Sequence, residues 1–381
     1  MTKKDILIVT KYFYPFNTPR AHRAFELARE MSRVGCNVTV LTAAYSDNYE
    51  ELENKEGIKI LVYKSYIRKN DIKIEDSAST ISIPKRFVNT FKRVMFTLSN
   101  YFLPEGRESV FAFKLYLYLR RFEGQYDLII SNAFPFAVHL GLCSKIKKLK
   151  KEGAVSVAET SDPFYFGHTK KAFYLKILEK KVLDKFDFIS VPIEGASNLL
   201  KKEYGFNNVK VIPQGYLLPE KVDVISETKN QCVTFCYAGR LYGDIRNPLN
   251  YIKLLSLLKV DFKFVMLLDM KSRETRELSY QYKKILGSKL VLKDFMPRKQ
   301  CIDYLRQFDF LINFSNTSSD KQLPSKLIDY AISNRPILSL STVNNENGKI
   351  ENFLNGNYSE ATFVDLNSHN IKNVAQRFLE L

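Results

Sequence analysis

The strongest constraint on the fold of this chain is a repeated alternation between short apolar runs and amphipathic helical patterns. Strands are predicted at residues 5–10, 37–42, 58–63, 127–131, 155–158, 187–191 and 209–213. The central runs show little polar alternation, which is typical of a parallel sheet covered on both faces. Between the first two runs, apolar residues recur at helical spacing from Ala24 to Met31, and Gly35 follows where a helix would end. This order predicts a βαβ unit.

A second series of the same kind occupies the rest of the chain. Its strands are predicted at residues 233–239, 262–268, 289–295, 309–314, 335–340 and 361–365. The intervening residues 214–230 carry Gly215, Pro219 and several charges without an apolar period, so they are predicted to form a linker. A length of 381 residues is enough for two hydrophobic cores.

The fold class that follows is α/β, with two Rossmann-like, doubly wound domains. The predicted domains are residues 1–213 and residues 231–369, and they are followed by a terminal helix at 370–381 whose domain the pattern leaves open. Ligands of open α/β sheets bind beyond the carboxyl ends of the strands. We therefore expect the facing edges of the two domains to form the functional cleft.

Composition excludes several classes of protein. The chain is 45% hydrophobic and 13% aromatic, which excludes a disordered or low-complexity polymer. Its five scattered cysteines suggest neither a disulfide framework nor a zinc cluster, so a reducing compartment is expected. The first apolar run is too short for a signal-peptide core, and no run reaches the roughly 18 apolar residues of a spanning helix. We expect a cytoplasmic protein that is soluble or peripheral to a membrane.

The net charge is +17, and much of the excess lies in one region. Residues 82–151 hold 13 basic and 4 acidic side chains, and phenylalanines are interleaved with them. Two interpretations have equal weight, a solvated basic surface and a surface that faces an anionic partner. No zinc-finger, RNP or helix-turn-helix pattern accompanies the charge, so nucleic acid is not expected as a partner. The expected anionic partner is the inner face of the cell membrane.

Several widespread catalytic motifs do not occur in the sequence. The chain contains no G-x-G-x-x-G, no G-x-x-x-x-G-K-[ST] and no G-x-S-x-G, which removes the usual sequence support for dinucleotide, P-loop and serine-hydrolase chemistry. The four histidines lie far apart and none belongs to an H-E-x-x-H pattern. We therefore expect no metal site.

Two segments of the first half carry more specific information. After the first strand, a proline-rich turn leads into an amphipathic helix with Arg20 and Arg23 near its start. The predicted strand at 155–158 is followed by Glu159 and Asp162. The carboxyl end of a strand is the position from which a side chain enters the cleft. Both segments are therefore candidate parts of a binding site.

Motifs in the second half, together with one turn before the linker, indicate a family. In chain order they are Ile212-Pro213-Gln214-Gly215, Gly239-Arg240 with Arg246 six residues later, Pro324-Ser325-Lys326 leading to Asp329-Tyr330, and Arg335-Pro336-Ile337. In order and spacing, this set resembles the motifs of the GT-B glycosyltransferases, specifically the retaining, family-4-like group that builds capsules, O-antigens and exopolysaccharides. The resemblance covers nearly the whole chain.

The resemblance implies a site for a nucleoside-diphosphate sugar as donor substrate, with UDP as the expected nucleotide and with no cofactor or metal. Arg240 and Arg246 are candidate catalytic residues, because fixed cations stabilise the negative charge that builds on the leaving diphosphate. Asp329 would accept hydrogen bonds from the ribose hydroxyls. A helix that begins near Pro324 would offer N–H groups to a phosphate. The implied donor-binding residues are Gly239, Arg240, Arg246, Phe295, Pro324, Ser325, Lys326 and Asp329.

The implied contacts to the transferred sugar and to the acceptor depend on shorter matches. Asp162 corresponds to a D-P-[FW] turn that faces the reacting sugar, which makes it a third candidate catalytic residue. An Asx turn before Pro163 is the alternative interpretation. The first Glu of the family's E-x7-E signature, which normally contacts the sugar, falls at Lys321, with Asp320 beside it. The candidate acceptor-side residues are Asn17, Arg20 and Glu159.

The resulting hypothesis is a glycosyltransferase, of hexosyl or N-acetylhexosaminyl type, that acts in bacterial surface polysaccharide synthesis. It would move a sugar from the nucleotide to a glycan or polyprenyl-diphosphate-linked acceptor, with retention and without a metal. Three alternatives stay open. Lys321 in place of Glu is compatible with a non-catalytic protein that binds sugar nucleotides or polysaccharide. A UDP-sugar 2-epimerase would share the architecture, although the few histidines argue against it, and a basic nucleic-acid binder ranks last.

Overall fold

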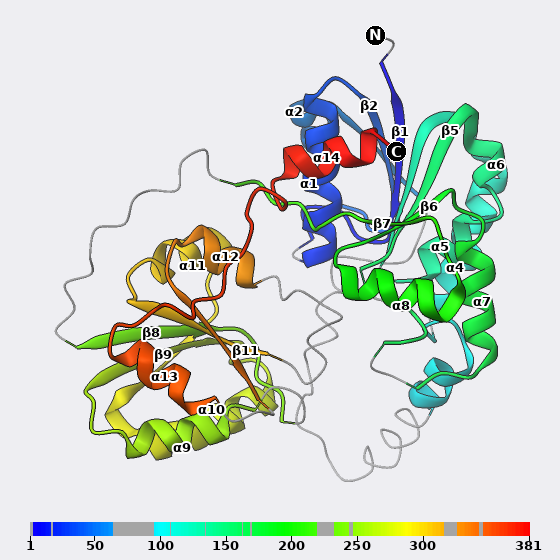
Figure 1. Cartoon of the computed structure of the whole chain (residues 1–381). Helices are drawn as coiled ribbons and strands as arrows, with labels where there is room; N and C mark the ends of the chain where they lie inside the picture. Colours follow the sequence, from blue (N-terminus) through cyan, green and yellow to red (C-terminus); the bar gives the residue numbers. More distant parts are fainter. Residues whose placement is uncertain are drawn as a thin grey trace. The chain divides into compact units, whose positions relative to one another are not determined.

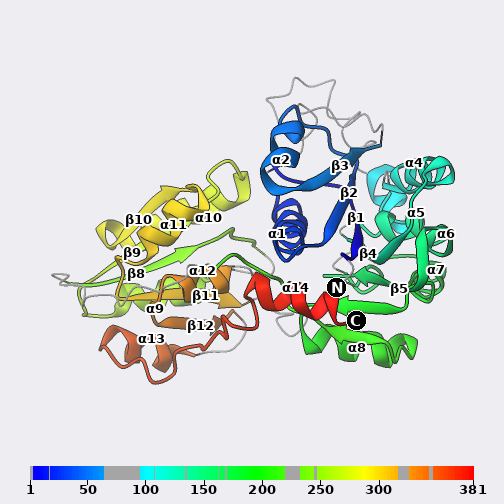
Figure 2. The same cartoon turned by 90° about the horizontal axis from the view of Figure 1, so that it is seen from above.

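The chain folds into two compact units. The computed structural model describes residues 3–16, 18–63, 95–106, 108–133, 135–161, 163–167, 170–218, 232–243, 247–315, 326–342 and 346–381. Unit 1 comprises residues 1–217 with 368–381, and unit 2 comprises residues 218–367. Each unit is built on a parallel sheet with helices around it (Figure 1, Figure 2). The predicted fold class, two Rossmann-like α/β domains, is confirmed.

In the described residues of unit 1, seven parallel strands form one sheet in the order β3-β2-β1-β4-β5-β6-β7. They are β1 (Asp5–Thr10), β2 (Asn37–Thr42), β3 (Ile58–Val62), β4 (Tyr126–Asn132), β5 (Lys150–Glu159), β6 (Phe188–Val191) and β7 (Val209–Val211). The chain starts in the middle of the sheet, runs outward to β3, and then returns to β4 beside β1. The strand order therefore reverses between β1 and β4, which makes their carboxyl ends the ligand-binding position of such a sheet.

Helices cover both faces of this sheet (Figure 1). They are α1 (Pro19–Arg33), α2 (Tyr49–Glu56), α4 (Glu108–Arg121), α5 (Ala137–Leu142), α6 (Ile146–Leu149), α7 (Tyr174–Leu183), α8 (Glu194–Tyr204) and α14 (Ile371–Leu379). In β1, Ile6 and Ile8 pack in the core of α1, α2 and α14, while Leu7 and Val9 pack in the core of α4, α5, α7 and α8. Burial on both faces explains why the strand sequences lack polar alternation.

The C-terminal helix α14 belongs to unit 1, which settles the question that the sequence left open. It packs on α1. Ahead of it, the Ile371 N–H donates to the Tyr216 carbonyl at 2.9 Å, and the Tyr216 N–H donates to the His369 carbonyl at 2.8 Å. A Cβ at Gly215 would lie 2.6 Å from Ile371 Cδ1, so the turn at Gly215 can approach the helix only because it has no side chain.

In the described residues of unit 2, five parallel strands follow the order β10-β9-β8-β11-β12. The strands are β8 (Val233–Ala238), β9 (Phe262–Leu268), β10 (Leu290–Asp294), β11 (Phe310–Ser315) and β12 (Ile337–Ser341). The helices are α9 (Leu249–Leu257), α10 (Arg273–Leu286), the short η2 (Gly287–Lys289), α11 (Arg298–Leu305), α12 (Lys326–Ile332) and α13 (Asn347–Leu354). The order reverses between β8 and β11, so the residues after β8 lie at the switch point of this sheet.

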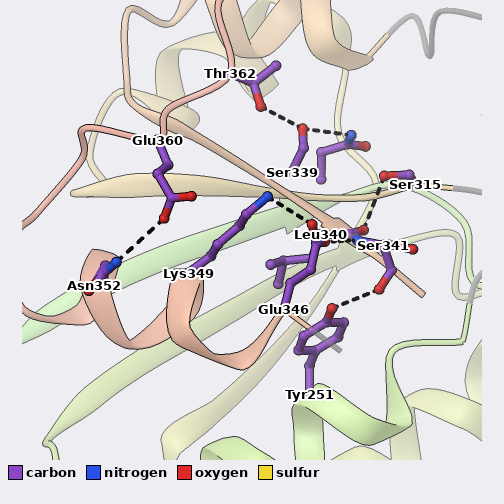
Figure 3. A network of polar contacts seen from close by, with 11 residues as sticks. Tyr251, Ser315, Ser339, Leu340, Ser341, Glu346, Lys349, Asn352, Glu360 and Thr362 are labelled. Carbon is purple, nitrogen blue, oxygen red and sulfur yellow. Dashed lines mark hydrogen bonds and ion pairs between the residues drawn. The ribbon is translucent and has the colours of Figure 1, made fainter. Parts of the chain in front are cut away.

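One predicted strand is wrong. Residues 361–365 alternate like a half-buried strand, but they form a loop beside the edge strand β12. The Thr362 N–H donates to the Ile337 carbonyl at 2.8 Å, and the Thr362 hydroxyl donates to Ser339 Oγ at 2.9 Å (Figure 3). The next residue, Phe363, is almost fully exposed. The hydrogen bonds of Thr362 to β12 are therefore not continued into a β-ladder. Of the two large apolar residues in this segment, Val364 packs partly against the core and Phe363 does not.

A buried histidine joins two strand ends in unit 1. His139 of α5 is fully buried, with Nδ1 2.6 Å from Ser131 Oγ of β4 and Nε2 3.1 Å from Thr160 Oγ1 after β5. Burial lowers the pKa of His139 to about 3, because a charged imidazole would lose its hydration. The side chain is therefore neutral at ordinary pH, and it is a packed residue rather than a catalytic one.

This burial predicts a pH-dependent stability. An unfolded histidine has a pKa near 6.5. Between that pH and about pH 3, the unfolded chain binds a proton that the folded chain does not bind. The free energy of unfolding should therefore decrease as the pH is lowered below 6, by about 1.4 kcal/mol for each pH unit. Hydrogen exchange of the β4 and β5 amides, corrected for the intrinsic exchange rate, measures this free energy at each pH. The slope should be smaller in His139→Gln, and parallel slopes would contradict the assignment.

Candidate functional site

The first part of the site is the turn that leaves β8. The Tyr237 hydroxyl donates to the Arg240 carbonyl at 2.7 Å, and the Gly239 N–H donates to the Leu267 carbonyl at 3.0 Å. A Cβ at Gly239 would lie 2.9 Å from the Tyr237 hydroxyl, which is closer than real Cβ contacts. Glycine is therefore required for the turn to close over the phenol, which gives a steric reason for a glycine before Arg240.

Arg240 lies at the carboxyl edge of the unit 2 sheet. One of its terminal nitrogens, Nη2, is 2.8 Å from Oδ2 of Asp269, the residue after β9. Asp269 is nearly buried, whereas 49% of the Arg240 side chain is exposed. The guanidinium is thus held at the switch point by a fixed carboxylate while much of its surface faces solvent.

Helix α12 is attached to the same strand end. The buried Tyr330 hydroxyl accepts a hydrogen bond from the Ala238 N–H at 2.7 Å and donates one to the Ala238 carbonyl at 3.2 Å. The backbone pairing between β8 and β11 ends at Cys236 and Leu311, so the phenol takes over where the ladder stops. Both backbone groups of Ala238 are satisfied by one side chain, which fixes α12 against the turn.

Lys326, the first residue of α12, completes this cluster. Its Nζ lies 4.4 Å from the centroid of the Tyr237 ring. Tyr237 therefore contacts both the Arg240 backbone and the Lys326 ammonium, although these two residues come from distant parts of the chain. Gly239, Arg240 and Lys326, three residues that the sequence assigned to donor binding, are brought together.

Asp329 lies one turn along α12, where it faces α11. Its Oδ1 accepts hydrogen bonds from Arg298, with 2.8 Å to Nε and 2.7 Å to Nη2. Burial raises the pKa of Asp329, and the Arg298 charge opposes that shift. Phe295, another predicted donor residue, is exposed just before α11. Sequence reasoning missed Arg298 and Asp269, and the available signal was only that each follows the end of a predicted strand.

Seven of the predicted site residues are not among those that the structure describes. In unit 2, Arg246, Asp320, Lys321, Pro324 and Ser325 lie outside the described residues, and in unit 1 the same holds for Asn17 and Asp162. The roles that the resemblance implies for these residues stay predictions.

In unit 1, the acceptor-side candidates surround the ends of β4 and β5. Glu159 is buried and its Oε1 lies 2.6 Å from Nη2 of Arg23, whose Nη1 donates to Ser161 Oγ at 2.6 Å. Arg20, one turn earlier on α1, donates from Nη1 to the Ala133 carbonyl at 3.2 Å. The ion-pair partner Arg23 was not among the candidates. This arrangement fixes the chain as it leaves β5.

The arrangement in unit 2 suits an anionic ligand with hydroxyl groups. A guanidinium and an ammonium flank the turn after β8, and a carboxylate that accepts hydrogen bonds lies on the same helix as the ammonium. Within the described ranges, no group of three or more His, Cys, Asp or Glu side chains could hold a metal ion. None of the helices in those ranges is long and apolar enough to cross a membrane.

Comparisons with known proteins find solved structures that share the fold of this chain. A glycosyltransferase from Rickettsia africae superposes with a TM-score of 0.58 at 14% identity, covering 100% of this chain and 98% of the other. TarM gives 0.59 at 11% identity, with 100% and 95% coverage. HepE of Anabaena in complex with UDP-glucose gives 0.54 at 11% identity, with 98% and 94% coverage.

At these identities the superpositions show the fold. The comparison with curated proteins found no match. The sequence profile described as Glycosyltransferase Family 4 matches residues 21–216, which is more than half of the chain. With the fold and the profile in agreement, the chain belongs to Glycosyltransferase Family 4 and is a glycosyltransferase.

Proposed function

We propose that this glycosyltransferase moves a hexosyl or N-acetylhexosaminyl group from a nucleoside-diphosphate sugar, with UDP as the nucleotide, to a glycan or polyprenyl-diphosphate-linked acceptor in bacterial surface polysaccharide synthesis. The proposal includes retention at the anomeric carbon and no requirement for a metal. The observation that carries it is the cluster in unit 2, where Arg240 and Lys326 meet at Tyr237 and Asp329 lies on the same helix.

The chemistry of transfer explains why such a cluster is useful. As the bond between sugar and diphosphate lengthens, negative charge grows on the bridging oxygen. Arg240 and Lys326, with Arg246 as a third cation, would stabilise this charge. A guanidinium binds phosphate through two parallel hydrogen bonds. Asp329 would accept hydrogen bonds from the ribose, and Asp162 would orient the acceptor hydroxyl or support the oxocarbenium-like transition state.

The structures of related folds support the choice of donor. HepE was solved with UDP-glucose, and S. aureus TarM was solved with UDP and alpha-GlcNAc-glycerol. A thermal-shift screen of nucleoside diphosphates and their sugars tests the proposal for this chain. A ligand at about 100 times its dissociation constant stabilises a protein by roughly 2.7 kcal/mol. Transfer assays with the best donor, with and without EDTA, then test turnover and the metal. A screen in which no nucleotide stabilises the protein would contradict the proposal.

Asp329 provides a test that does not need the sugar. Asp329→Ala should weaken binding of bare UDP about 10- to 100-fold, because a charge-assisted hydrogen bond contributes about 1.5 to 3 kcal/mol. Isothermal titration calorimetry measures the affinity. Asp303→Ala is the matched control, since Asp303 is an exposed carboxylate of α11 paired with Arg306 at 3.8 Å. Unchanged UDP affinity in Asp329→Ala would show that this carboxylate does not bind the ribose.

Arg240 should act more on turnover than on donor affinity. The charge that it stabilises grows only in the transition state, so Arg240→Ala should lower kcat by about one to two orders of magnitude. Arg240→Lys should restore only part of the loss, because an ammonium lacks the planar fork. Combining the change with Arg246→Ala should cost less than the product of the two single losses. Steady-state kinetics that show an effect on KM alone would contradict this role.

The proposal also places the protein on the inner face of the cell membrane, through an apolar face of unit 1. The residues that would form this face lie in the helical segment 95–102, on α4 and at the start of α7. Its exposed large apolar residues are Met95, Phe96, Leu98, Tyr101, Phe102, Leu103, Val110, Phe113, Leu117, Phe173, Tyr174 and Ile177. The Ala172 N–H donates to the Tyr101 carbonyl at 3.0 Å, and the Tyr174 hydroxyl donates to the Phe102 carbonyl.

The basic residues near this face supply the second element of membrane binding. Lys114 lies on α4, and Lys170 and Lys171 precede α7. The rest of the basic cluster before residue 95, and Arg107, lie outside the described residues. Apolar side chains and basic charges together favour an anionic bilayer, at about 1 kcal/mol per basic residue near the surface.

Co-sedimentation tests this surface. Vesicles that contain phosphatidylglycerol should bind more protein at low salt than pure phosphatidylcholine vesicles do. Replacing Phe113 and Phe173 by Ser should lower binding at least several-fold, because both rings are among the most exposed of the apolar face. Leu257→Ser, at an exposed apolar residue of unit 2, is the matched control. Equal binding to the two kinds of vesicle would contradict the proposed preference for an anionic membrane.

A further inference from the structure

Tyr237 contacts both ends of the cationic cluster, Arg240 and Lys326. It is the last but one residue of β8 and it is fully buried. Its hydroxyl donates to the Arg240 carbonyl at 2.7 Å, and its ring lies under Lys326 Nζ at 4.4 Å from the centroid. One phenol therefore fixes the backbone that carries one cation and the side chain that carries the other.

The surroundings of Tyr237 leave the phenol little freedom. The Phe314 ring of β11 packs on it, with 5.2 Å between ring centroids. The hydroxyl is held by its hydrogen bond to the Arg240 carbonyl at 2.7 Å. A buried ring in close packing has one rotamer, so the hydroxyl and the ring face are fixed in direction. Tyr237 therefore sets the position of the turn at Arg240 and of the Lys326 ammonium.

The Tyr237 ring also reduces the repulsion between the Arg240 and Lys326 charges. Two cations near one turn repel each other when no anion is bound. The Asp269 carboxylate compensates Arg240, and the negative face of the Tyr237 ring attracts the Lys326 ammonium. The ring can do this without competing for the ligand, since it brings no net negative charge that would repel a phosphate.

We propose that Tyr237 is a positioning residue for the diphosphate, acting through Arg240 and Lys326. The inference rests on the proposed function, because it assigns the cluster to the diphosphate of the donor. It adds a residue that touches no substrate and yet sets the geometry of two that do. A displacement of about 1 Å in a catalytic group can cost as much as 100-fold in rate, so the effect should be visible in kinetics.

Two variants separate the two contacts. Tyr237→Phe keeps the ring under Lys326 and removes the hydrogen bond to the Arg240 carbonyl, and Tyr237→Leu removes both. Tyr251→Phe is the matched control. Tyr251 is a buried residue of the same unit, and its hydroxyl donates to the Ser341 carbonyl, also at 2.7 Å (Figure 3). Each Phe variant loses a phenol-to-carbonyl hydrogen bond of the same length, so an effect of lost stability alone should appear in both.

The expected result is a kinetic effect in the Tyr237 variants only. Tyr237→Phe should lower kcat by about 10-fold, and Tyr237→Leu should lower it further and weaken binding of UDP and of pyrophosphate. Tyr251→Phe should change kcat and KM less than twofold. In an Arg240→Ala background the additional effect of Tyr237→Phe should disappear, because a residue that acts through Arg240 has nothing left to position.

Other outcomes overturn the inference. Full turnover and full UDP affinity in Tyr237→Phe would do so, as would an undiminished effect in the Arg240→Ala background. Titrating pyrophosphate in parallel distinguishes this failure from failure of the proposed function. If the wild-type protein binds pyrophosphate but not UDP, and Tyr237→Leu loses that binding, the nucleotide proposal fails and the positioning role stands. If the wild type binds neither probe, both are wrong.

Discussion

The site in unit 2 depends on the two hydrogen bonds between the Tyr330 hydroxyl and the backbone of Ala238. The pairing of β8 with β11 ends at Cys236 and Leu311 although both strands continue, so the Ala238 N–H and carbonyl have no partner in β11. A buried pair of this kind must be satisfied. Here a side chain of α12 satisfies both, so the helix is attached at the point where β8 ends. Lys326 lies one turn before Tyr330 on that helix, and Arg240 lies two residues after Ala238. The distance between the two cations is therefore a consequence of a backbone requirement of the sheet.

In unit 2, opposite charges already hold the residues assigned to the nucleotide. Arg240 is paired with Asp269, and Asp329 with Arg298. Asp269 is nearly buried, so separating it from Arg240 would leave an uncompensated charge in the protein. Because 49% of the Arg240 side chain is exposed, the guanidinium can keep this carboxylate and still face a diphosphate. The pairs also keep the side chains extended over the strand ends, so less rotational freedom is lost when a donor binds.

The sequence predicts the sheets well because their signal is local. Two-sided burial leaves continuous apolar runs, and each run contains its own evidence. Residues 361–365 have the same local pattern and yet form a loop, since strand formation at an edge depends on a neighbour that the pattern does not reveal. The ion pairs of Asp269, Arg298 and Arg23 were not predicted, for a related reason. Each of these residues meets its counter-charge through the strand order, and no spacing in the sequence connects the two residues of any of these pairs.

Two of the carboxylates that the sequence analysis named as candidates, Glu159 and Asp329, differ in what they can offer a ligand. Glu159 is 1% exposed and its partner Arg23 is 7% exposed, whereas the corresponding values are 26% for Asp329 and 46% for Arg298. Separating a buried pair leaves an uncompensated charge in the core, at a cost of about 3 to 5 kcal/mol. Glu159 therefore keeps Arg23, and through it the Ser161 hydroxyl, while Asp329 can share its acceptor sites with a ligand. A role for Glu159 on the acceptor side is then a positioning role, exerted by fixing the chain where β5 ends.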